Sequence, residues 1–230
     1  MDFTEFEKQI NFIFKNKSLL KTSFTHRSYI NENRGLHLEH NERLEFLGDA
    51  VLELIVTEFL FAKYPAKPEG ELTAFRSALV NANTLSDLAT KIGMNDFLLL
   101  SRGEAKDTGR ARQIILANAF EALIGALFLD QGYKSAEEFI TKYLLPMIDE
   151  IVKEKMWLDS KSHFQEKAQE IVGVTPSYKT ESEVGPDHDK QFTVGVYLGS
   201  EKVAEGHGRS KQEAEQSAAS AGLEAKHWEE

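Results

Sequence analysis

The spacing of apolar residues changes near Trp157, and this change constrains the fold of the 230-residue chain more than any other feature. Before it, apolar residues recur three and four positions apart, which is typical of helices that bury one face. Four such stretches stand out: Leu44–Leu60, Leu72–Leu88, Ile114–Leu129 and Ala136–Ile151. Turn-forming residues interrupt the pattern at 31–36, 64–70 and 101–109. Residues 1–156 are therefore predicted to form an all-α domain.

The residues after the change read as a helix, three alternating stretches and a second helix. Asp159 or Ser160 is predicted to cap a helix that Gly173 closes, and Ser210 to cap a last, alanine-rich helix. The three predicted strands are Ser177–Glu183, Gln191–Leu198 and Lys202–Gly208. The inward face of the last helix is expected to carry Ala214, Ala218, Ala221 and Ala225. Residues 157–230 are thus predicted to form a small α+β domain of order α-β-β-β-α, after a linker near residues 154–159.

Composition limits the classes of function. The chain has no cysteine, which excludes disulfides and thiolate metal sites and is typical of a reducing cytoplasm. The N-terminus lacks a secretory signal, and no apolar run reaches the roughly 18–20 residues that span a bilayer, so we expect a cytoplasmic protein without a membrane partner. The net charge is −10, with 8 Lys and Arg against 14 Asp and Glu after residue 156. Charge alone therefore argues against a nucleic-acid partner.

A stripe of acids marks the first long predicted helix. Glu42, Glu45 and Asp49 lie at i, i+3 and i+7, so their side chains would project within about 60° of one another. Carboxylates so close repel one another, and most of the remaining helix surface is apolar. A bound cation would offset the repulsion, and oxygen ligands select Mg²⁺, with Mn²⁺ as a substitute. An ordinary solvated acidic face is the alternative interpretation.

Two features favour the metal site over the solvated face. Gly48 lies inside the same helix, where glycine is unfavourable by about 1 kcal/mol relative to alanine, and it indicates that another backbone or a bulky partner approaches closely. A second predicted helix carries a lone acid, Glu121, on an apolar surface, with the amide of Asn118 three residues before it. A buried lone glutamate is unfavourable unless it is paired or bound to a metal. The two helices together are predicted to supply an oxygen shell.

The sequence around these acids resembles the signature motif of bacterial ribonuclease III, the endonuclease that cuts double-stranded RNA. The resemblance rests on the blocks Thr25–Tyr29, Asn41–Ala50, Glu69–Thr73 and Ala117–Gly125. Further along, the spaced glycines, serine, lysine and alanines of Gly206–Ala219 resemble a double-stranded-RNA-binding domain. The blocks follow the family's order over essentially the whole chain. The resemblance implies an all-α endonuclease domain followed by a small α+β RNA-binding domain.

The resemblance also implies roles for the acids. It places the family's metal-binding and catalytic carboxylates on Glu45, Asp49 and Glu121, with Asp49 and Glu121 as the catalytic pair. Glu42 matches the first acid of the signature, which is implicated in binding RNA or a second metal ion. Glu69 matches a family residue near the active-site valley.

Two positions need separate interpretation. Asn118 stands at a metal-ligand position where many family members have aspartate, and an amide oxygen can coordinate Mg²⁺ without adding charge. We therefore expect the geometry of the site to survive with a lower affinity for the ion. Phe46 matches the aromatic residue that packs into a socket on the partner subunit of a homodimer, although an ordinary core phenylalanine is an equal alternative.

The RNA-binding residues are likewise implied by the resemblance. Such domains read the minor-groove 2′-hydroxyls and the flanking phosphates of duplex RNA by shape. The positions matched to the two minor grooves are Gln165 and Glu166 on the first helix and Pro186, Asp187 and His188 in the loop after the first strand. Arg209 and Lys211 match the cations that meet phosphate at the start of the last helix. Gln212 replaces a second lysine common in the family, so weaker binding than usual is expected.

Three functional hypotheses follow. The first is a Mg²⁺-dependent homodimeric endoribonuclease without an organic cofactor, which leaves 5′-phosphates and short 3′ overhangs and processes ribosomal and messenger RNA. The second is a double-stranded-RNA-binding protein of the same fold, catalytically impaired by Asn118. The third is an acidic, helical structural protein, which requires the C-terminal motif to be accidental. The sequence favours the enzyme.

Overall fold

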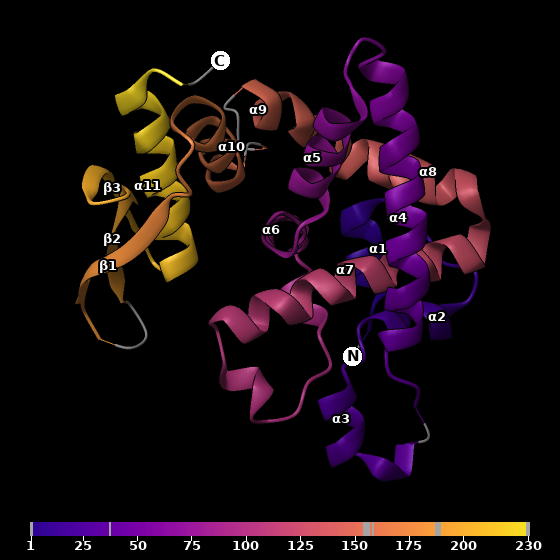
Figure 1. Ribbon diagram of the computed structural model, residues 1–230. Coiled ribbons are helices and arrows are strands. Elements are labelled where there is room, and N and C mark those ends of the chain that lie inside the picture. Colours follow the sequence, from indigo (N-terminus) through magenta and orange to yellow (C-terminus); the bar gives the residue numbers. More distant parts are fainter. Residues whose placement is uncertain (1, 37, 154–156, 158, 187–189, 229–230) are drawn as a thin grey trace. The chain divides into compact units, whose positions relative to one another are not determined.

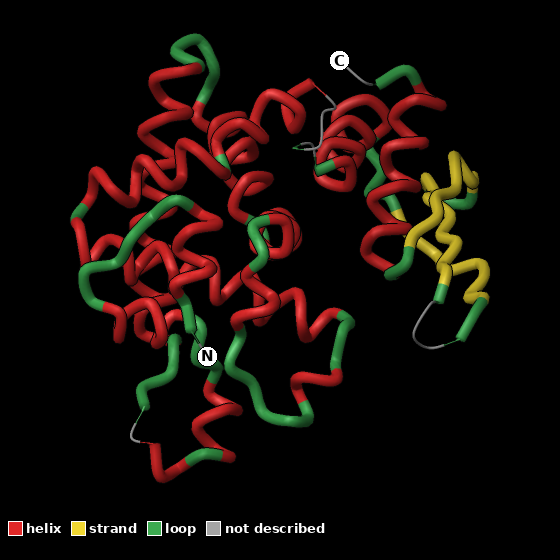
Figure 2. The backbone as a smooth tube through the Cα atoms, turned by 180° about the vertical axis from the view of Figure 1, so that it is seen from behind, coloured by secondary structure: helices red, strands yellow, loops and turns green. Residues whose placement is uncertain are grey.

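The computed structural model describes residues 2–36, 38–153, 157, 159–186 and 190–228. The chain divides into two compact units, Met1–Trp157 and Leu158–Glu230 (Figure 1). The first unit is built from helices and the second from three strands and two helices (Figure 2). The predicted fold class, an all-α domain followed by a small α+β domain, is confirmed.

The first unit contains the helices α1 to α9 in chain order, and its longest connection lies between α6 and α7. The α-helices are α1 (Thr4–Ile10), α2 (Lys17–Ser23), α3 (Arg27–Glu32), α4 (Glu42–Lys63), α5 (Glu69–Val80), α6 (Ala82–Lys91), α7 (Arg110–Gln131), α8 (Tyr133–Tyr143) and α9 (Ile148–Lys153). Short 3₁₀ turns lie between them: η1 (Arg34–Leu36), η2 (Met94–Phe97), η3 (Glu104–Lys106) and η4 (Leu145–Met147). The long connection from α6 to α7 thus contains two of these turns.

Two of the predicted helical stretches are each divided in the structure. The stretch Leu72–Leu88 is split at Asn81, whose backbone is extended and whose side chain accepts a hydrogen bond from the Thr84 N–H at 2.9 Å. Asn81 therefore ends α5 and caps α6. The stretch Ala136–Ile151 is broken by η4, which contains Pro146. Proline has no N–H to donate to the preceding turn, so the helix restarts after it.

The helix α7 is the central element of the first core. It contacts α2, α4, α6 and α8, and most of its middle residues are buried. Among the described residues, α7 is the one helix whose length and composition would allow it to cross a membrane, although the sequence analysis expected no such segment. Its burial inside the unit accounts for this apolar composition, since helices that are apolar all round are found in protein cores as well as in membranes.

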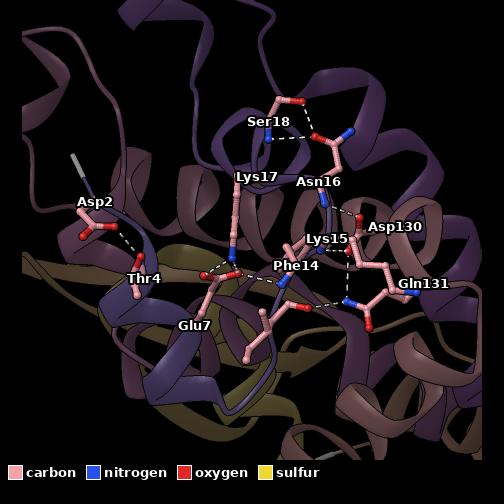
Figure 3. A network of polar contacts seen from close by, with 11 residues as sticks. Asp2, Thr4, Glu7, Phe14, Lys15, Asn16, Lys17, Ser18, Asp130 and Gln131 are labelled. Carbon is pink, nitrogen blue, oxygen red and sulfur yellow. Dashed lines mark hydrogen bonds and ion pairs between the residues drawn. The ribbon is translucent and has the colours of Figure 1, made fainter.

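A polar network fixes the N-terminal segment to the end of α7 (Figure 3). Glu7 is 3% exposed, and its carboxylate accepts hydrogen bonds from Lys17 Nζ at 2.6 Å and from the Phe14 N–H at 2.7 Å. The Asp130 carboxylate accepts the backbone N–H groups of Lys15 and Asn16, both at 2.7 Å. A buried carboxylate is costly unless it is paired in this way. The network therefore stabilises the segment between α1 and α2.

The second unit packs two helices against one face of an antiparallel sheet. Its elements are α10 (Ser160–Val172), β1 (Ser177–Val184), β2 (Gln191–Leu198), β3 (Glu201–Gly208) and α11 (Lys211–Lys226), with strand order β1-β2-β3. The predicted caps are confirmed, because Asp159 accepts from the Ser162 N–H and Ser210 from the Glu213 N–H. Phe164 of α10 is fully buried between the layers.

The buried face of α11 differs from the predicted one. Ala214 and Ala218 are buried as expected, whereas Ala225 is exposed and Ala221 only partly buried. The face instead continues through Gly222, where a Cβ atom would lie 2.9 Å from the Phe164 ring. Gly222 thus faces Phe164, the largest buried side chain of this core. The buried face of α11 therefore excludes Ala225 and includes Ala221 only in part.

Candidate functional site

The helices α4 and α7 cross in direct backbone contact (Figure 1). A Cβ atom on Gly48 of α4 would lie 1.7 Å from the carbonyl oxygen of Glu121, and one on Gly125 of α7 would lie 2.2 Å from that of Leu44. Neither position can hold a larger residue without separating the helices. The prediction that another backbone approaches Gly48 is confirmed, and the approaching residue is the acidic one of α7.

This crossing brings Glu45 and Asp49 of α4 into electrostatic contact with Glu121 of α7. Burial, followed by the charges of Asp49 and Glu45 and then of Glu53, raises the pKa of Glu121 to about 7. Burial, followed by the charge of Glu42, also raises the pKa of Glu45. Among the described residues, the charged groups that act most strongly on these two carboxyls are all acids. The site has an excess of negative charge.

Asn118 belongs to the same cluster. Its side chain hydrogen-bonds to Glu45 and lowers the pKa of that carboxyl, which partly opposes the effects of burial and of Glu42. The amide therefore donates an N–H to Glu45, because a donor stabilises the charged form. One further acid, Glu53, was missed by the sequence reasoning, although its position four residues after Asp49 on α4 is a usable signal.

The chemistry of this donor set fits a hard divalent cation. Carboxylate and amide oxygens are the ligands that Mg²⁺ and Mn²⁺ prefer, and the uncompensated negative charge would favour such an ion. Among the described residues, no three Asp, Glu, His or Cys side chains already surround a common point as a ready metal site. Side-chain rotation would have to bring the oxygens together around an ion.

Glu42 lies at the exposed start of α4, in a more basic environment. Arg27 Nη1 is 3.5 Å from one of its carboxylate oxygens, and His40 Nδ1 is 3.7 Å from the other. The buried Asn41 fixes this end of the helix, since its backbone N–H donates to the Thr25 carbonyl at 2.9 Å and its side chain to the Ser23 carbonyl at 3.2 Å. The block Thr25–Tyr29 thus positions the first acid of the stripe.

Glu69 belongs to a different cluster. It begins α5, where it accepts a hydrogen bond from Thr73 Oγ1 at 3.2 Å. It lines a groove of about 420 Å³ together with Thr57 and Phe61 of α4 and Arg76 of α5. It is not among the groups that shift the pKa values of Glu45 and Glu121. Within one chain, the structure therefore does not bring Glu69 together with the acids of the crossing.

Phe46 is 82% exposed, so its interpretation as an ordinary core phenylalanine is wrong for this chain. It lies on one face of α4 with Ala50, with Leu54 at 57% exposure and with Phe61 at 74% exposure. These positions recur at helical spacing. We call these four residues the α4 stripe.

The matched RNA-binding residues lie on the surface of the second unit. Gln165 and Glu166 are exposed on α10, and Pro186 is exposed after β1. Asp187 and His188 lie outside the described residues. Arg209 and Lys211 flank Ser210 at the start of α11 and are both exposed.

The start of α11 is capped from both sides. Ser210 Oγ accepts the Glu213 N–H at 3.2 Å, and the Glu213 carboxylate accepts the Arg209 N–H at 2.8 Å. Sequence reasoning had assigned the cap to Ser210 but had not used Glu213, although a serine with a glutamate three residues later is a known capping pattern. The helix therefore begins at a fixed point and presents Lys211 outward.

Family models match both units of the chain. A Ribonuclease-III-like family model matches residues 16–148, and a double-stranded RNA binding motif matches residues 160–226. Ribonuclease 3 of Bacillus velezensis is 46% identical over 221 residues, which cover 96% of this chain and 88% of that protein. Ribonuclease 3 of Streptococcus pneumoniae is 46% identical over 211 residues, which cover 92% of this chain and 90% of that protein.

A solved structure matches the first unit. The nuclease domain of ribonuclease III from Campylobacter jejuni is 36% identical with a TM-score of 0.57, and the match covers 63% of this chain and 99% of that one. The two family models, the two relatives and this structure point to one conclusion. The chain belongs to the ribonuclease III family of double-stranded-RNA-specific endoribonucleases.

Proposed function

We propose that the chain cleaves duplex RNA at the crossing of α4 and α7, with Mg²⁺ as the natural ion and Mn²⁺ as a substitute. Glu45, Asp49 and Glu121 would hold the ion, with Asn118 beside them. The observation that carries the proposal is the glycine-mediated crossing, because it joins acids from two helices, and the charged groups of the described residues that act most strongly on Glu45 and Glu121 are themselves acids. When bound, a divalent ion activates a water for attack on phosphorus and stabilises the departing 3′-oxygen.

The side chains of the site prepare this chemistry. Glu121 is partly protonated near neutral pH in the ion-free protein, and a nearby cation would favour its charged form. Asp49 is exposed on α4, so it is accessible to substrate, and its charge acts on Glu121. We assign Asp49 and Glu121 the catalytic roles of binding the ion and orienting the attacking water.

The alternative hypothesis, a catalytically impaired double-stranded-RNA-binding protein, depends on Asn118. By donating to Glu45 it stabilises that carboxylate, but it brings no charge of its own. The three carboxylates that remain support turnover with a raised requirement for the ion. If the missing charge prevented turnover, the chain would be a catalytically impaired double-stranded-RNA-binding protein.

We further propose that two copies associate through the α4 stripe. Phe46, Leu54 and Phe61 expose a run of apolar surface along one helix, and such a surface on a chain of this type is best covered by its own copy. A twofold arrangement would place two acidic sites on one duplex, one for each strand. It would also offer Glu69 and the groove around it to the second copy. Cleavage of both strands would leave 5′-phosphates and short 3′ overhangs.

The second unit would hold the duplex. Gln165 and Glu166 would face one minor groove and the loop with Pro186, Asp187 and His188 the next, while Arg209 and Lys211 meet the phosphates between. Glu42 would contact RNA or a second ion near the cleavage site. The 46% identity with bacterial ribonuclease 3 proteins supports the cleavage of double-stranded RNA. We propose in addition that the chain processes ribosomal and messenger RNA in the cytoplasm and needs no organic cofactor.

The test is cleavage of a long, perfectly paired RNA by the full chain, with Mg²⁺, with Mn²⁺ and with EDTA. The proposal predicts endonucleolytic products only with a divalent ion, and end mapping should find 5′-phosphates and matched cuts in both strands. Duplex that is bound but left intact at every ion concentration would support the impaired-protein alternative. Cleavage of one strand only would contradict the twofold arrangement.

A further inference from the structure

The Glu183 carboxylate forms an ion pair with Lys211, the lysine that is proposed to contact the phosphates of the RNA backbone. Lys211 Nζ is 2.7 Å from Glu183 Oε1, and Lys190 Nζ is 3.7 Å from the other oxygen of the same carboxylate. The Lys211 side chain is 57% exposed and the Glu183 side chain 37% exposed. Both partners are thus accessible from solvent, and the hydrogen bond from Lys211 is the largest cause that lowers the pKa of Glu183.

A bulge in β1 places Glu183 at this point. The pairing of β1 with β2 shifts between Thr180 and Ser182, after which Glu183 pairs with Phe192. Phe192 pairs in turn with Gly208 at the end of β3, shortly before Lys211. One row across the sheet therefore leads from Glu183 to the first turn of α11. Lys211 Nζ also lies 5.7 Å from the centre of the Phe192 ring, on the same side of the sheet.

We propose that Glu183 competes with RNA phosphate for Lys211 and thereby sets the affinity of this domain for duplex RNA. The inference rests on the proposed contact of Lys211 with phosphate. A phosphate that binds Lys211 must displace the carboxylate or accept its repulsion at short range, because both groups are anions. An exposed ion pair is weak in water, so the carboxylate can be displaced rather than blocking the site.

The ion pair also affects the salt dependence of binding. A lysine paired with a carboxylate brings no net charge to the RNA, so its contact with phosphate releases fewer of the cations condensed on the duplex. Without Glu183, Lys211 would neutralise a phosphate and release the cations condensed there. Removal of the Glu183 charge should therefore both tighten binding and steepen the fall of affinity with salt.

A second ion pair on the same helix supplies a matched control. Lys226 Nζ lies 2.8 Å from Glu201 Oε1, and both side chains are partly exposed. Lys226 ends α11, fifteen positions after Lys211, which corresponds to about 22 Å along the helix. Glu201→Gln therefore removes the same charge from the same domain, but far from the proposed phosphate contact.

The experiment measures binding of the full chain to a labelled RNA duplex in EDTA by fluorescence anisotropy over a series of KCl concentrations, with RNA integrity checked on a gel. Glu183→Gln should bind at least about threefold more tightly at low salt, and the slope of log K against log salt should steepen by about 0.9, the value for one additional phosphate contact. Glu201→Gln should change affinity less than twofold and leave the slope unchanged. Glu183→Thr, which suits a strand, should match Glu183→Gln.

Two further variants separate this inference from the proposed function. Lys211→Gln should weaken binding, and Glu183→Gln should bring no gain when combined with it. If Lys211→Gln weakens binding but Glu183→Gln behaves like Glu201→Gln, the competition is refuted while the phosphate contact stands. If Lys211→Gln leaves binding unchanged, the proposed contact is wrong and the inference fails with it.

Discussion

Replacing Glu121 by glutamine should stabilise the ion-free protein. The carboxyl has its pKa raised from 4.5 to about 7 in the folded state, which corresponds to at most about 3 kcal/mol, since one pKa unit is about 1.4 kcal/mol. The side chain is only partly buried, so solvent screening reduces this figure to about 1–2 kcal/mol. Glutamine has nearly the same shape but no charge, so the variant should recover this free energy.

The sign of the effect depends on pH. A carboxyl whose pKa is higher in the folded state binds more protons there than in the unfolded state, so stability falls as the pH rises between 4.5 and about 7. The full penalty is present above pH 7. Glu121→Gln should therefore be more stable than the unmodified chain at pH 8, and the difference should shrink as the pH is lowered to 5.

Urea unfolding in EDTA, followed by far-ultraviolet circular dichroism at both pH values, measures this difference. Glu138→Gln is the control, because Glu138 is an exposed acid on α8 and should have little effect at either pH. A Glu121→Gln variant that is less stable than the unmodified chain at pH 8 would contradict the claim that the Glu121 charge destabilises the ion-free protein. The carboxylate would then stabilise the fold itself.

Three further predictions concern the crossing and the α4 stripe. Gly48→Ala should lower the free energy of unfolding by about 3 kcal/mol, because its Cβ would meet the Glu121 carbonyl; normal stability in urea would mean that the helices can separate without cost. Phe46→Glu should sediment as a monomer and cleave duplex RNA very slowly, and a monomeric unmodified chain at micromolar concentration would rule out the proposed dimer. Asn118→Asp should lower the Mg²⁺ concentration for half-maximal cleavage roughly tenfold, from a net gain of about 1.4 kcal/mol. An unchanged Mg²⁺ titration would mean that Asn118 is not a ligand.

Much of the fold was predictable because its signals are local. The capping residues Asp159 and Ser210 predicted where two helices begin, and the alternation of apolar residues in Gln191–Leu198 predicted the central strand. Gly48 indicated that another backbone or a bulky partner approaches closely, because glycine is unfavourable inside a helix, and the structure shows that the approaching group is the Glu121 backbone. The break at Asn81 was missed because the apolar spacing continues across it, and only the extended backbone reveals that asparagine acts there as a cap.

Other features depend on long-range geometry. The exposure of Phe46 could not be predicted from the sequence, because α4 is apolar on several faces and its packing against α7 determines which face is buried. The contact of Glu183 with Lys211 depends on the bulge in β1, and a shift of one residue would turn Glu183 to the opposite face of the sheet. The excess negative charge at Glu121 likewise appears only when α4 and α7 are brought together.

The most direct test of the central claim compares cleavage and binding by Glu121→Gln and the unmodified chain. Single-turnover cleavage of a uniform RNA duplex at saturating Mg²⁺ is measured beside anisotropy of the same duplex in EDTA. We predict that the variant loses cleavage and keeps nearly unchanged affinity for the duplex, because Glu121 lies at the α4–α7 crossing and the second unit is proposed to hold the RNA. Cleavage by the variant at the unmodified rate would mean that Glu121 has no part in the reaction.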